Sequence, residues 1–163
     1  MTLAIDIAAT AAWKKALPQY KAIVRRAAQA TLKALRLPPA EISIVLTNNA
    51  QVQKLNRLYR GQDKPTNVLS FPQVSGGNIA MDKKHKPPLP LGDVVIAYPY
   101  AAREAKAQGK SLRAHTIHLL IHGILHLLGY DHGRAQEAKQ MENLEKKILR
   151  QFGIKNPYEV SHG

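Results

Sequence analysis

Alternating apolar and polar residues mark four short segments of the chain as β-strands. In the first segment, Leu3, Ile5 and Ile7 face one side and Asp6 faces the other, which is the period of two that a half-buried strand shows. The other three segments are residues 41–47, 68–71 and 92–98. We therefore expect a small sheet of about four strands.

Apolar residues recur at helical spacing in about five further segments. These segments are residues 18–35, 51–60, 99–108, 111–128 and 134–152. In the second, Val52, Leu55 and Leu58 recur at every third position and are expected to face inward. Residues 8–17 are expected to form a linker, and residues 73–91, which show no apolar period, a surface loop.

Strands and helices alternate early in the chain, and helices collect late. This order favours an α+β fold, in which about five helices pack over a mixed sheet of about four strands. The chain has 163 residues, of which 45% are hydrophobic and 21% charged, as in ordinary globular proteins. We expect a single domain over residues 1–163.

The chain carries a strong positive charge. Lys and Arg number 24 and Asp and Glu 11, which gives a net charge of +13. Such an excess in a small domain favours a polyanionic partner, and nucleic acid is the first candidate. A generally basic proteome or an acidic lipid surface would also account for the charge. The residues expected to follow a nucleic-acid backbone are Lys14, Lys15, Arg25, Arg26 and the basic segment 83–86.

Two absences narrow the choice of chemistry and of location. Without cysteine, the chain has no disulfides and no thiolate ligands, so a metal must be held by His or carboxylate groups. The N-terminus has no basic segment before its apolar stretch, and no stretch approaches the roughly 18 apolar residues of a membrane span. We expect a cytoplasmic protein with no membrane partner.

Five of the seven histidines lie between residues 115 and 132. In a helix, four of them share a stripe roughly 80° wide, because each residue turns the chain by about 100°. These four are His115, His118, His122 and His126. A single histidine on such a helix is usually a hydrogen-bonded core residue. Burying several unpaired imidazole nitrogens, however, would cost about 1 to 3 kcal/mol each, which favours a metal site.

The spacing selects three ligands from these five histidines. His118 and His126 lie about 12 Å apart along a helix, too far for both to bind one ion through bonds near 2.1 Å. The pair His122 and His126 is favoured because Gly129 ends the helix and lets the chain turn back toward His132. Three imidazoles leave a coordination position open, and this donor set favours one Zn²⁺, although Ni²⁺, Cu²⁺ or Fe²⁺ would also fit.

The spacing resembles the H-E-x-x-H helix of zinc proteases but lacks its general base. Gly123 stands where those enzymes carry the glutamate, and general acid–base groups contribute typically about 10²- to 10⁴-fold to rates. Peptide hydrolysis is therefore disfavoured. Gly123 instead lets a backbone or substrate approach the metal, or packs against a strand.

Several blocks of the sequence resemble the YbeY endoribonuclease family of bacterial rRNA maturation factors. The longest is HGILHLLGYDH at residues 122–132, which matches the family signature throughout. The others are LNRLYRGQDKPTNVLSFP at 55–72, LGDVVIAYPYAAREA at 91–105, and Thr116-Ile117-His118. No motif of the family is recognised in the N-terminal helix or in residues 73–90.

The resemblance implies a metal-dependent endoribonuclease that cuts single-stranded RNA. Such enzymes act in small-subunit rRNA processing, especially at the 3′ end, and in ribosome quality control. By the same match, His122, His126 and His132 are zinc ligands and Arg60 is important for activity. The family has a compact α+β fold whose metal-site helix is distantly similar to that of zinc proteases. The implied partners are rRNA of the small subunit, a small-subunit ribosomal protein and an assembly GTPase.

Two other functions stay open from the sequence, together with the roles of three residues. The chain could be a non-catalytic ribosome-assembly factor with a structural zinc, or a metal-dependent hydrolase of peptides or small molecules. Arg60 either clamps a phosphoryl oxygen or forms a surface salt bridge. Asp131 either orients a ligand imidazole or caps the turn, and His118 lines the cleft or contacts phosphate. No cofactor besides the metal is expected.

Overall fold

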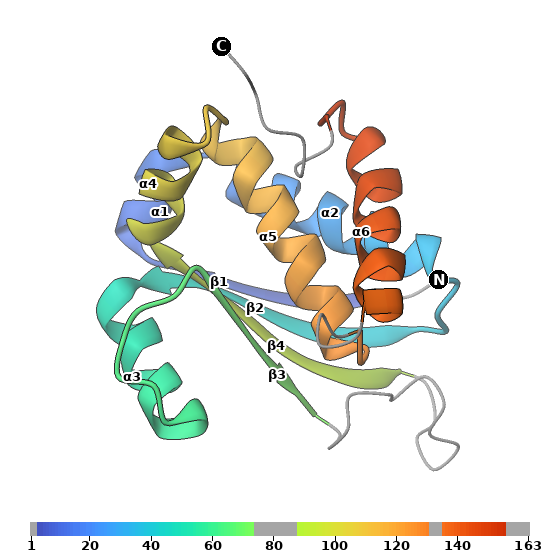
Figure 1. Cartoon of the computed structure of the whole chain (residues 1–163), viewed down its shortest axis with the longest axis horizontal. Helices are drawn as coiled ribbons and strands as arrows, with labels where there is room; N and C mark the ends of the chain where they lie inside the picture. Colours follow the sequence, from blue (N-terminus) through green and yellow to red (C-terminus); the bar gives the residue numbers. More distant parts are fainter. Residues whose placement is uncertain (1–2, 74–87, 131–134, 156–163) are drawn as a thin grey trace.

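Four strands form one mixed sheet in the computed structural model of the chain (Figure 1). The structure describes residues 3–73, 88–130 and 135–155. The strands are β1 (Leu3–Ala9), β2 (Ala40–Asn48), β3 (Val68–Pro72) and β4 (Leu89–Tyr98). Their order is β1-β2-β4-β3, with β1, β2 and β4 parallel and β3 antiparallel to β4 at the edge.

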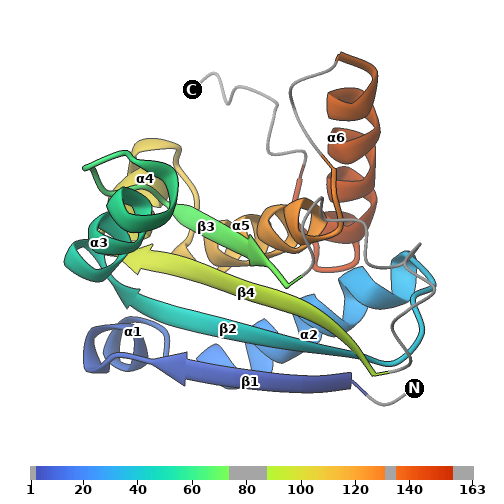
Figure 2. The same cartoon turned by 90° about the horizontal axis from the view of Figure 1, so that it is seen from below.

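Six helices accompany the sheet within the described residues, and they cover its two faces unequally (Figures 1 and 2). They are α1 (Ala11–Ala16), α2 (Tyr20–Ala34), α3 (Asn49–Arg60), α4 (Tyr100–Ala107), α5 (Leu112–Leu127) and α6 (Ala135–Arg150). Helix α5 crosses one face of the sheet between α2 and α6, whereas α3 lies against the other face.

The alternation of side chains along the strands creates two hydrophobic cores. Ile44, Leu46 and Val94 belong to the larger core, which they share with α2, α5 and α6. Val95, one position along β4, belongs to a smaller core beneath Val52 of α3. The period of two therefore sends neighbouring residues of one strand to opposite faces, and the larger core supports α5.

The expected α+β fold with a four-stranded mixed sheet is confirmed, but the number of helices is not. The segment expected to be a linker contains α1, which Thr10 caps and Trp13 anchors. The Trp13 side chain is fully buried, and its indole N–H donates to the Thr47 carbonyl at 2.9 Å. A six-residue helix is too short to show an apolar period, and so the pattern did not predict it.

Strand β4 and helix α3 also differ from the sequence-based expectation. β4 begins at Leu89, three residues before its predicted start. At Gly92, φ is +129°, and any Cβ there would collide with the Phe71 carbonyl, so this position requires glycine. Leu58 is 61% exposed instead of facing inward. An i, i+3, i+6 row drifts about 60° around a helix at each step, which carries Leu58 away from the face of Val52.

Candidate metal centre and active site

Helix α5 carries the histidines, and local signals fix where it begins and ends. The Ser111 side chain caps it by accepting from the Ala114 N–H at 3.0 Å. At the other end, Gly129 has φ +94°. The Gly129 N–H donates to the His126 carbonyl and the Tyr130 N–H donates to the Leu125 carbonyl, each at 3.1 Å. This pair of bonds is a Schellman motif, which turns the chain sharply after the last histidine of the helix.

Gly123 holds α5 close to the sheet. A Cβ at this position would lie 2.7 Å from Val94 Cγ1 and 3.2 Å from both Ser70 Oγ and Val68 Cγ2. The Ser70 hydroxyl donates to the Gly123 carbonyl at 2.8 Å. Of the two roles expected for Gly123, packing against a strand is therefore the one observed. The position that carries the general base in zinc proteases has no room for a glutamate here.

A chain of short contacts joins α6 to two histidines of α5. Glu145 Oε1 lies 2.6 Å from His122 Nδ1, and His122 Nε2 lies 3.0 Å from His126 Nε2. The Glu145 side chain is completely buried, whereas His122 is 23% exposed. An ionised carboxylate only accepts hydrogen bonds, so His122 Nδ1 carries the proton and donates. The Nε2 atom of a neutral His122 then holds its lone pair toward His126.

This arrangement fits a metal held by imidazole nitrogens. In a tetrahedral site with bonds of about 2.0–2.1 Å, neighbouring ligand nitrogens lie about 3.3 Å apart, close to the 3.0 Å between the two Nε2 atoms. Histidine ligands commonly donate their second N–H to a carboxylate, which fixes the tautomer and the orientation of the ring. Glu145 provides such a carboxylate for His122.

Another grouping of the same side chains could also hold an ion. His118, His122 and Glu145 each offer a ligand atom, and the three atoms lie within 4.8 Å of one another. His118 Nε2 lies 3.2 Å from Glu145 Oε2, so one buried carboxylate contacts two histidines. The chain thus contains a His/Glu group suited to a metal ion. The two groupings differ in whether Glu145 is a ligand or holds a ligand in place.

His115 belongs to a separate contact at the start of α5. Its Nε2 lies 2.6 Å from Glu104 Oε1 on α4, and the Asn67 amide donates to the same oxygen at 3.0 Å. His115 is only 2% exposed, and its Nδ1 is buried without a hydrogen-bond partner within the described part of the chain. Burial lowers the pKa of His115, although the hydrogen bond and charge of Glu104 oppose this effect. His115 is therefore a neutral core residue.

The structure brings together only some of the residues predicted for the site. His122 and His126 are in contact, and His118 meets them through Glu145. His132 and Asp131 lie outside the described residues. Arg60 is exposed at the end of α3, which packs on the face of the sheet opposite α5. No contact in the described part of the chain joins Arg60 to a histidine of α5.

Sequence reasoning missed Glu145, although the pattern of α6 contains a signal for it. Met141, Ile148 and Leu149 are buried. Glu145 comes four residues after Met141 and three before Ile148, so it occupies the buried stripe of an amphipathic helix. A glutamate is almost never fully buried without a partner. Its place in that stripe therefore predicts a contact with a polar group on the facing element.

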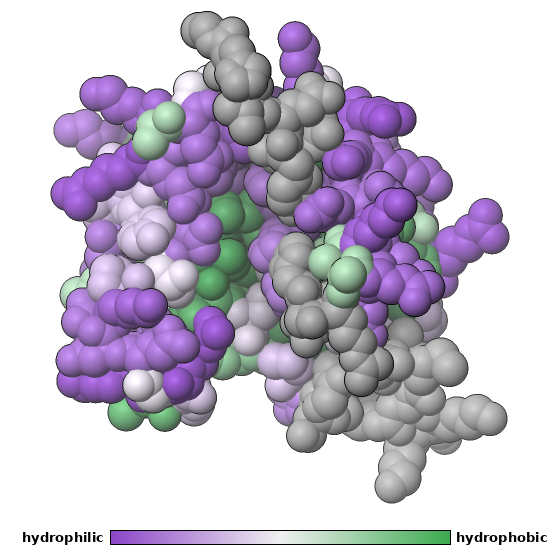
Figure 3. All heavy atoms as spheres, viewed as in Figure 1, coloured by the Kyte–Doolittle hydropathy of each residue, from purple (hydrophilic) through white to green (hydrophobic). Residues whose placement is uncertain are grey.

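Two helices carry the described residues that are expected to follow RNA. Lys14 and Lys15 end α1, whereas Arg25 and Arg26 lie on α2, and all four are exposed. Segment 83–86 lies outside the described residues. Figure 3 shows apolar side chains over the middle of the molecule, flanked by hydrophilic side chains.

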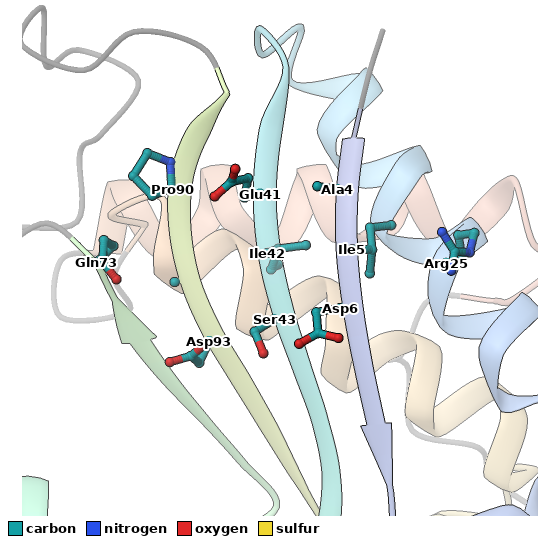
Figure 4. A pocket seen from close by; sticks show the side chains of 11 residues that line it. Ala4, Ile5, Asp6, Arg25, Glu41, Ile42, Ser43, Gln73, Pro90 and Asp93 are labelled. Carbon is teal, nitrogen blue, oxygen red and sulfur yellow. The ribbon is translucent and has the colours of Figure 1, made fainter.

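A groove of about 590 Å³ lies over the N-terminal ends of β1, β2 and β4, away from the histidines (Figure 4). Three carboxylates line it, from Asp6, Glu41 and Asp93. Asp6, Ser43 and Asp93 are aligned across the three strands. Arg25 also lines the groove, but the three carboxylates outnumber it and repel phosphate, so this groove is a poor site for a polyanion. None of the helices in the described ranges is long and apolar enough to cross a membrane.

Comparison with known proteins places the chain in a family. Residues 8–153 match the family model described as endoribonuclease YbeY. A protein named endoribonuclease YbeY from Paramagnetospirillum magneticum is 46% identical over 97% of this chain and 98% of its own length. A protein of the same name from Alkalilimnicola ehrlichii is 42% identical over 97% of this chain and 92% of its own length.

A solved structure supports the fold. The solution structure of a Thermotoga maritima protein aligns with 90% of this chain and 87% of its own, with a TM-score of 0.60 and 22% sequence identity. Together with the match of the family model and the similarity over nearly full length, this confirms the resemblance found in the sequence. The chain belongs to the endoribonuclease YbeY family.

Proposed function

We propose that this chain is a metal-dependent endoribonuclease that cuts single-stranded RNA. Its proposed role is in maturation of small-subunit rRNA, especially at the 3′ end, and in ribosome quality control. The observation that carries the proposal is the His122 ring, which Glu145 holds by Nδ1 while Nε2 faces His126 Nε2 at 3.0 Å. Family membership supports RNA cleavage as the reaction, and the +13 charge suits a polyanionic substrate.

The proposed metal is a single Zn²⁺ held by His122, His126 and His132. A divalent ion there supplies Lewis acidity, which polarises a phosphoryl oxygen and lowers the pKa of water. Glu145 keeps His122 in the tautomer whose Nε2 lone pair faces His126 and fixes the plane of its ring. Glu145 and His118 then lie beside the ligands and do not bind the ion themselves.

The chain's cationic groups perform the remaining tasks of the proposed reaction. Arg60 binds a non-bridging phosphate oxygen and stabilises the negative charge that builds up during cleavage. Arg60 is exposed on the last turn of α3, so an RNA strand can reach it from solvent. Membership of the YbeY family supports Arg60 as the proposed catalytic group.

The sheet argues against the peptidase alternative. A glutamate at position 123 would have to enter the space occupied by Val94 and Ser70. The residue that serves as general base in zinc proteases therefore has no counterpart on this turn of α5. Phosphodiester cleavage by a 2′-hydroxyl or water would use a base elsewhere in the site, which takes the proton of the attacking group while the bond from phosphorus to the leaving oxygen breaks.

We propose rRNA of the small subunit as the main partner, and a small-subunit ribosomal protein and an assembly GTPase as further partners. The proposed location is the cytoplasm. Phosphate contacts predict a steep salt response, with log K falling by about 0.7 per log unit of salt for each single-strand phosphate neutralised. A binding constant independent of salt would contradict the nucleic-acid substrate.

Metal analysis of two variants distinguishes the two possible ligand groups. With His122, His126 and His132 as ligands, His126→Ala loses zinc during purification and His118→Ala retains close to one ion per chain. The reverse result would assign the ion to His118, His122 and Glu145. Titration with a chromogenic chelator measures both variants beside the unmodified chain.

Cleavage of a structured rRNA fragment tests the activity. The metal-loaded chain should cut single-stranded segments, whereas His126→Ala and Arg60→Ala should be strongly impaired. Equal cleavage by all three preparations would reveal a contaminating nuclease and remove the catalytic claim. A 2′-deoxyribose at the cut site then separates the attacking groups: cleavage stops if the 2′-hydroxyl attacks and continues if water does.

A further inference from the structure

Two adjacent large apolar residues of α3 point into solvent. Leu58 is 61% and Tyr59 69% exposed, and they are the exposed large apolar side chains among the residues that the structure describes. Apolar side chains are visible at the α3 corner of the molecule in Figure 3. Single exposed leucines are common and need no explanation. An aromatic ring as open as Tyr59 is the more informative of the two.

A second aromatic residue fixes the orientation of the Tyr59 ring. Its centroid lies 5.3 Å from that of Phe71, and the two planes meet at 62°. Phe71 is itself packed against the small core that includes Val52 and Leu69. One part of the Tyr59 ring is thus braced by β3 while most of it stays in solvent. A braced tyrosine loses little conformational entropy when a ligand stacks on it.

Hydrogen bonds also make the backbone around Tyr59 rigid. Gly61 ends α3 in the left-handed conformation with φ +69°. Asn56, which is 1% exposed, donates from its side-chain amide to the Lys64 carbonyl at 2.9 Å. The turn that follows Tyr59 is therefore tied back to the helix, and the ring is presented from a fixed support.

The charge around this ring is positive. Helix α3 contains Lys54, Arg57 and Arg60 and no acidic residue, and all three cations are exposed. The nearby Asp63 accepts a hydrogen bond from the Gln53 amide at 3.0 Å. Arginines in the last turn interact favourably with the negative end of the helix dipole, and this interaction alone would explain their position. Cations around an open aromatic ring, however, are the combination that binds single-stranded nucleic acid.

The ring lies beside an edge of the sheet that separates it from α5. Val68 and Ser70 of β3 face Gly123 of α5, whereas Phe71 faces α3. β3 is the last strand in the sheet order. An RNA strand that crosses the edge of β3 would pass from the histidines to Tyr59, with Arg60 beside it.

We propose that Tyr59, braced by Phe71, is a stacking platform for one unpaired base of the RNA. The sequence shows no array of aromatic residues for reading RNA, and this platform needs only one. Every base has a π face, so the platform selects unpaired over paired RNA without selecting a sequence. The proposal rests on the proposed function and adds to it the origin of the single-strand preference.

Binding measurements with two strands of equal length test the platform. Fluorescence anisotropy gives the Kd of the full chain for a labelled single-stranded oligoribonucleotide and for an abasic sugar–phosphate strand, with RNA integrity checked on a gel. We expect Tyr59→Ala to weaken binding of the base-bearing strand by about fivefold to 100-fold. Binding of the abasic strand should stay within about twofold.

Three further variants separate stacking from other causes. Tyr59→Phe keeps the ring and should bind as the unmodified chain does. Leu58→Ala removes the neighbouring exposed side chain and should change Kd by less than about twofold. Arg57→Ala should reduce the salt slope by about 0.7, whereas Tyr59→Ala should leave that slope unchanged.

The outcomes also separate this proposal from the proposed function. If Tyr59→Ala binds both strands as the unmodified chain does, the platform is wrong and the nuclease function stands. An equal loss on both strands would likewise overturn stacking. If the unmodified chain binds neither strand, the RNA function fails and the platform fails with it.

Discussion

Two histidines of α5 each contact a glutamate of another helix at the same distance, with different consequences. His115 lies 2.6 Å from Glu104, and His122 lies 2.6 Å from Glu145. The first pair uses Nε2 of its histidine, whereas the second uses Nδ1. His115 is then left with a buried Nδ1, while His122 presents Nε2 to His126 at 3.0 Å.

The difference shows what makes a histidine a candidate ligand. In each pair the glutamate fixes one ring nitrogen, and the position of the other nitrogen decides its use. The ring of His115 is 2% exposed and that of His122 is 23% exposed, so only the second can reach an ion supplied from solvent. His115 is therefore a core residue of the fold, and we propose His122 as a metal ligand.

The largest expected effect contrasts alanine variants of the two histidines. His122→Ala should lower metal affinity by well over the roughly 10- to 100-fold typical of an outer-shell group, and RNA cleavage should fall with it. His115→Ala should retain the metal but lose about 1–3 kcal/mol of stability. Metal titration, cleavage assays and urea unfolding measure the three quantities. Loss of metal from both variants would remove the distinction between the pairs.

A smaller effect is expected when the glutamates are changed. Glu145→Gln keeps the size of the side chain but weakens its hold on His122, and we expect metal affinity to fall about 10- to 100-fold. Glu104→Gln is the matched control and should leave metal affinity unchanged. Competition with a chelator of known affinity measures both variants. Equal affinities of the two variants would exclude a role for Glu145 at the metal.

A variant of Gly123 tests how tightly α5, which carries His122, packs on the sheet. Gly123→Ala places a Cβ 2.7 Å from Val94 Cγ1, and such overpacking typically costs about 1–3 kcal/mol. Val94→Ala in the same chain should recover part of this loss, because it removes the atom in contact. Urea unfolding of the two single variants and the double variant gives the coupling energy. If the changes in the free energy of unfolding are strictly additive, the added Cβ does not press on Val94, and α5 has shifted away from the sheet to make room for it.

The strands and the His-bearing helix could be predicted because each follows a strong local pattern. All four predicted strands are present, since alternation of period two reports directly on a half-buried sheet. Ser111 and Gly129 fixed the ends of α5 through their side-chain and backbone preferences. The shared face of His122 and His126 follows from helical geometry alone.

Other features depend on tertiary contacts that a local pattern does not contain. Helix α1 exists because Trp13 is buried and bonded to Thr47, 34 residues away in sequence. Glu145 could be recognised as buried from its place in α6, but its partners could be named only once α6 lay beside α5. The separation of His115 from His122 needed the positions of both glutamates, because the two histidines share one helical stripe.

The smallest expected effect is the response of the first pair to pH. Burial lowers the pKa of His115 from its ordinary value of 6.5, despite the opposing contribution of Glu104. As pH falls below about 6.5, the unfolded chain therefore binds a proton that the folded chain refuses, and the free energy of unfolding decreases. His115→Gln lacks this group, so its free energy of unfolding should decrease less over the same range. Urea unfolding between about pH 7.5 and pH 5, with a chelator present to remove the contribution of metal release, measures the difference. Parallel curves for the two chains would mean that His115 binds its proton equally well when folded, contrary to its assignment as a neutral core residue.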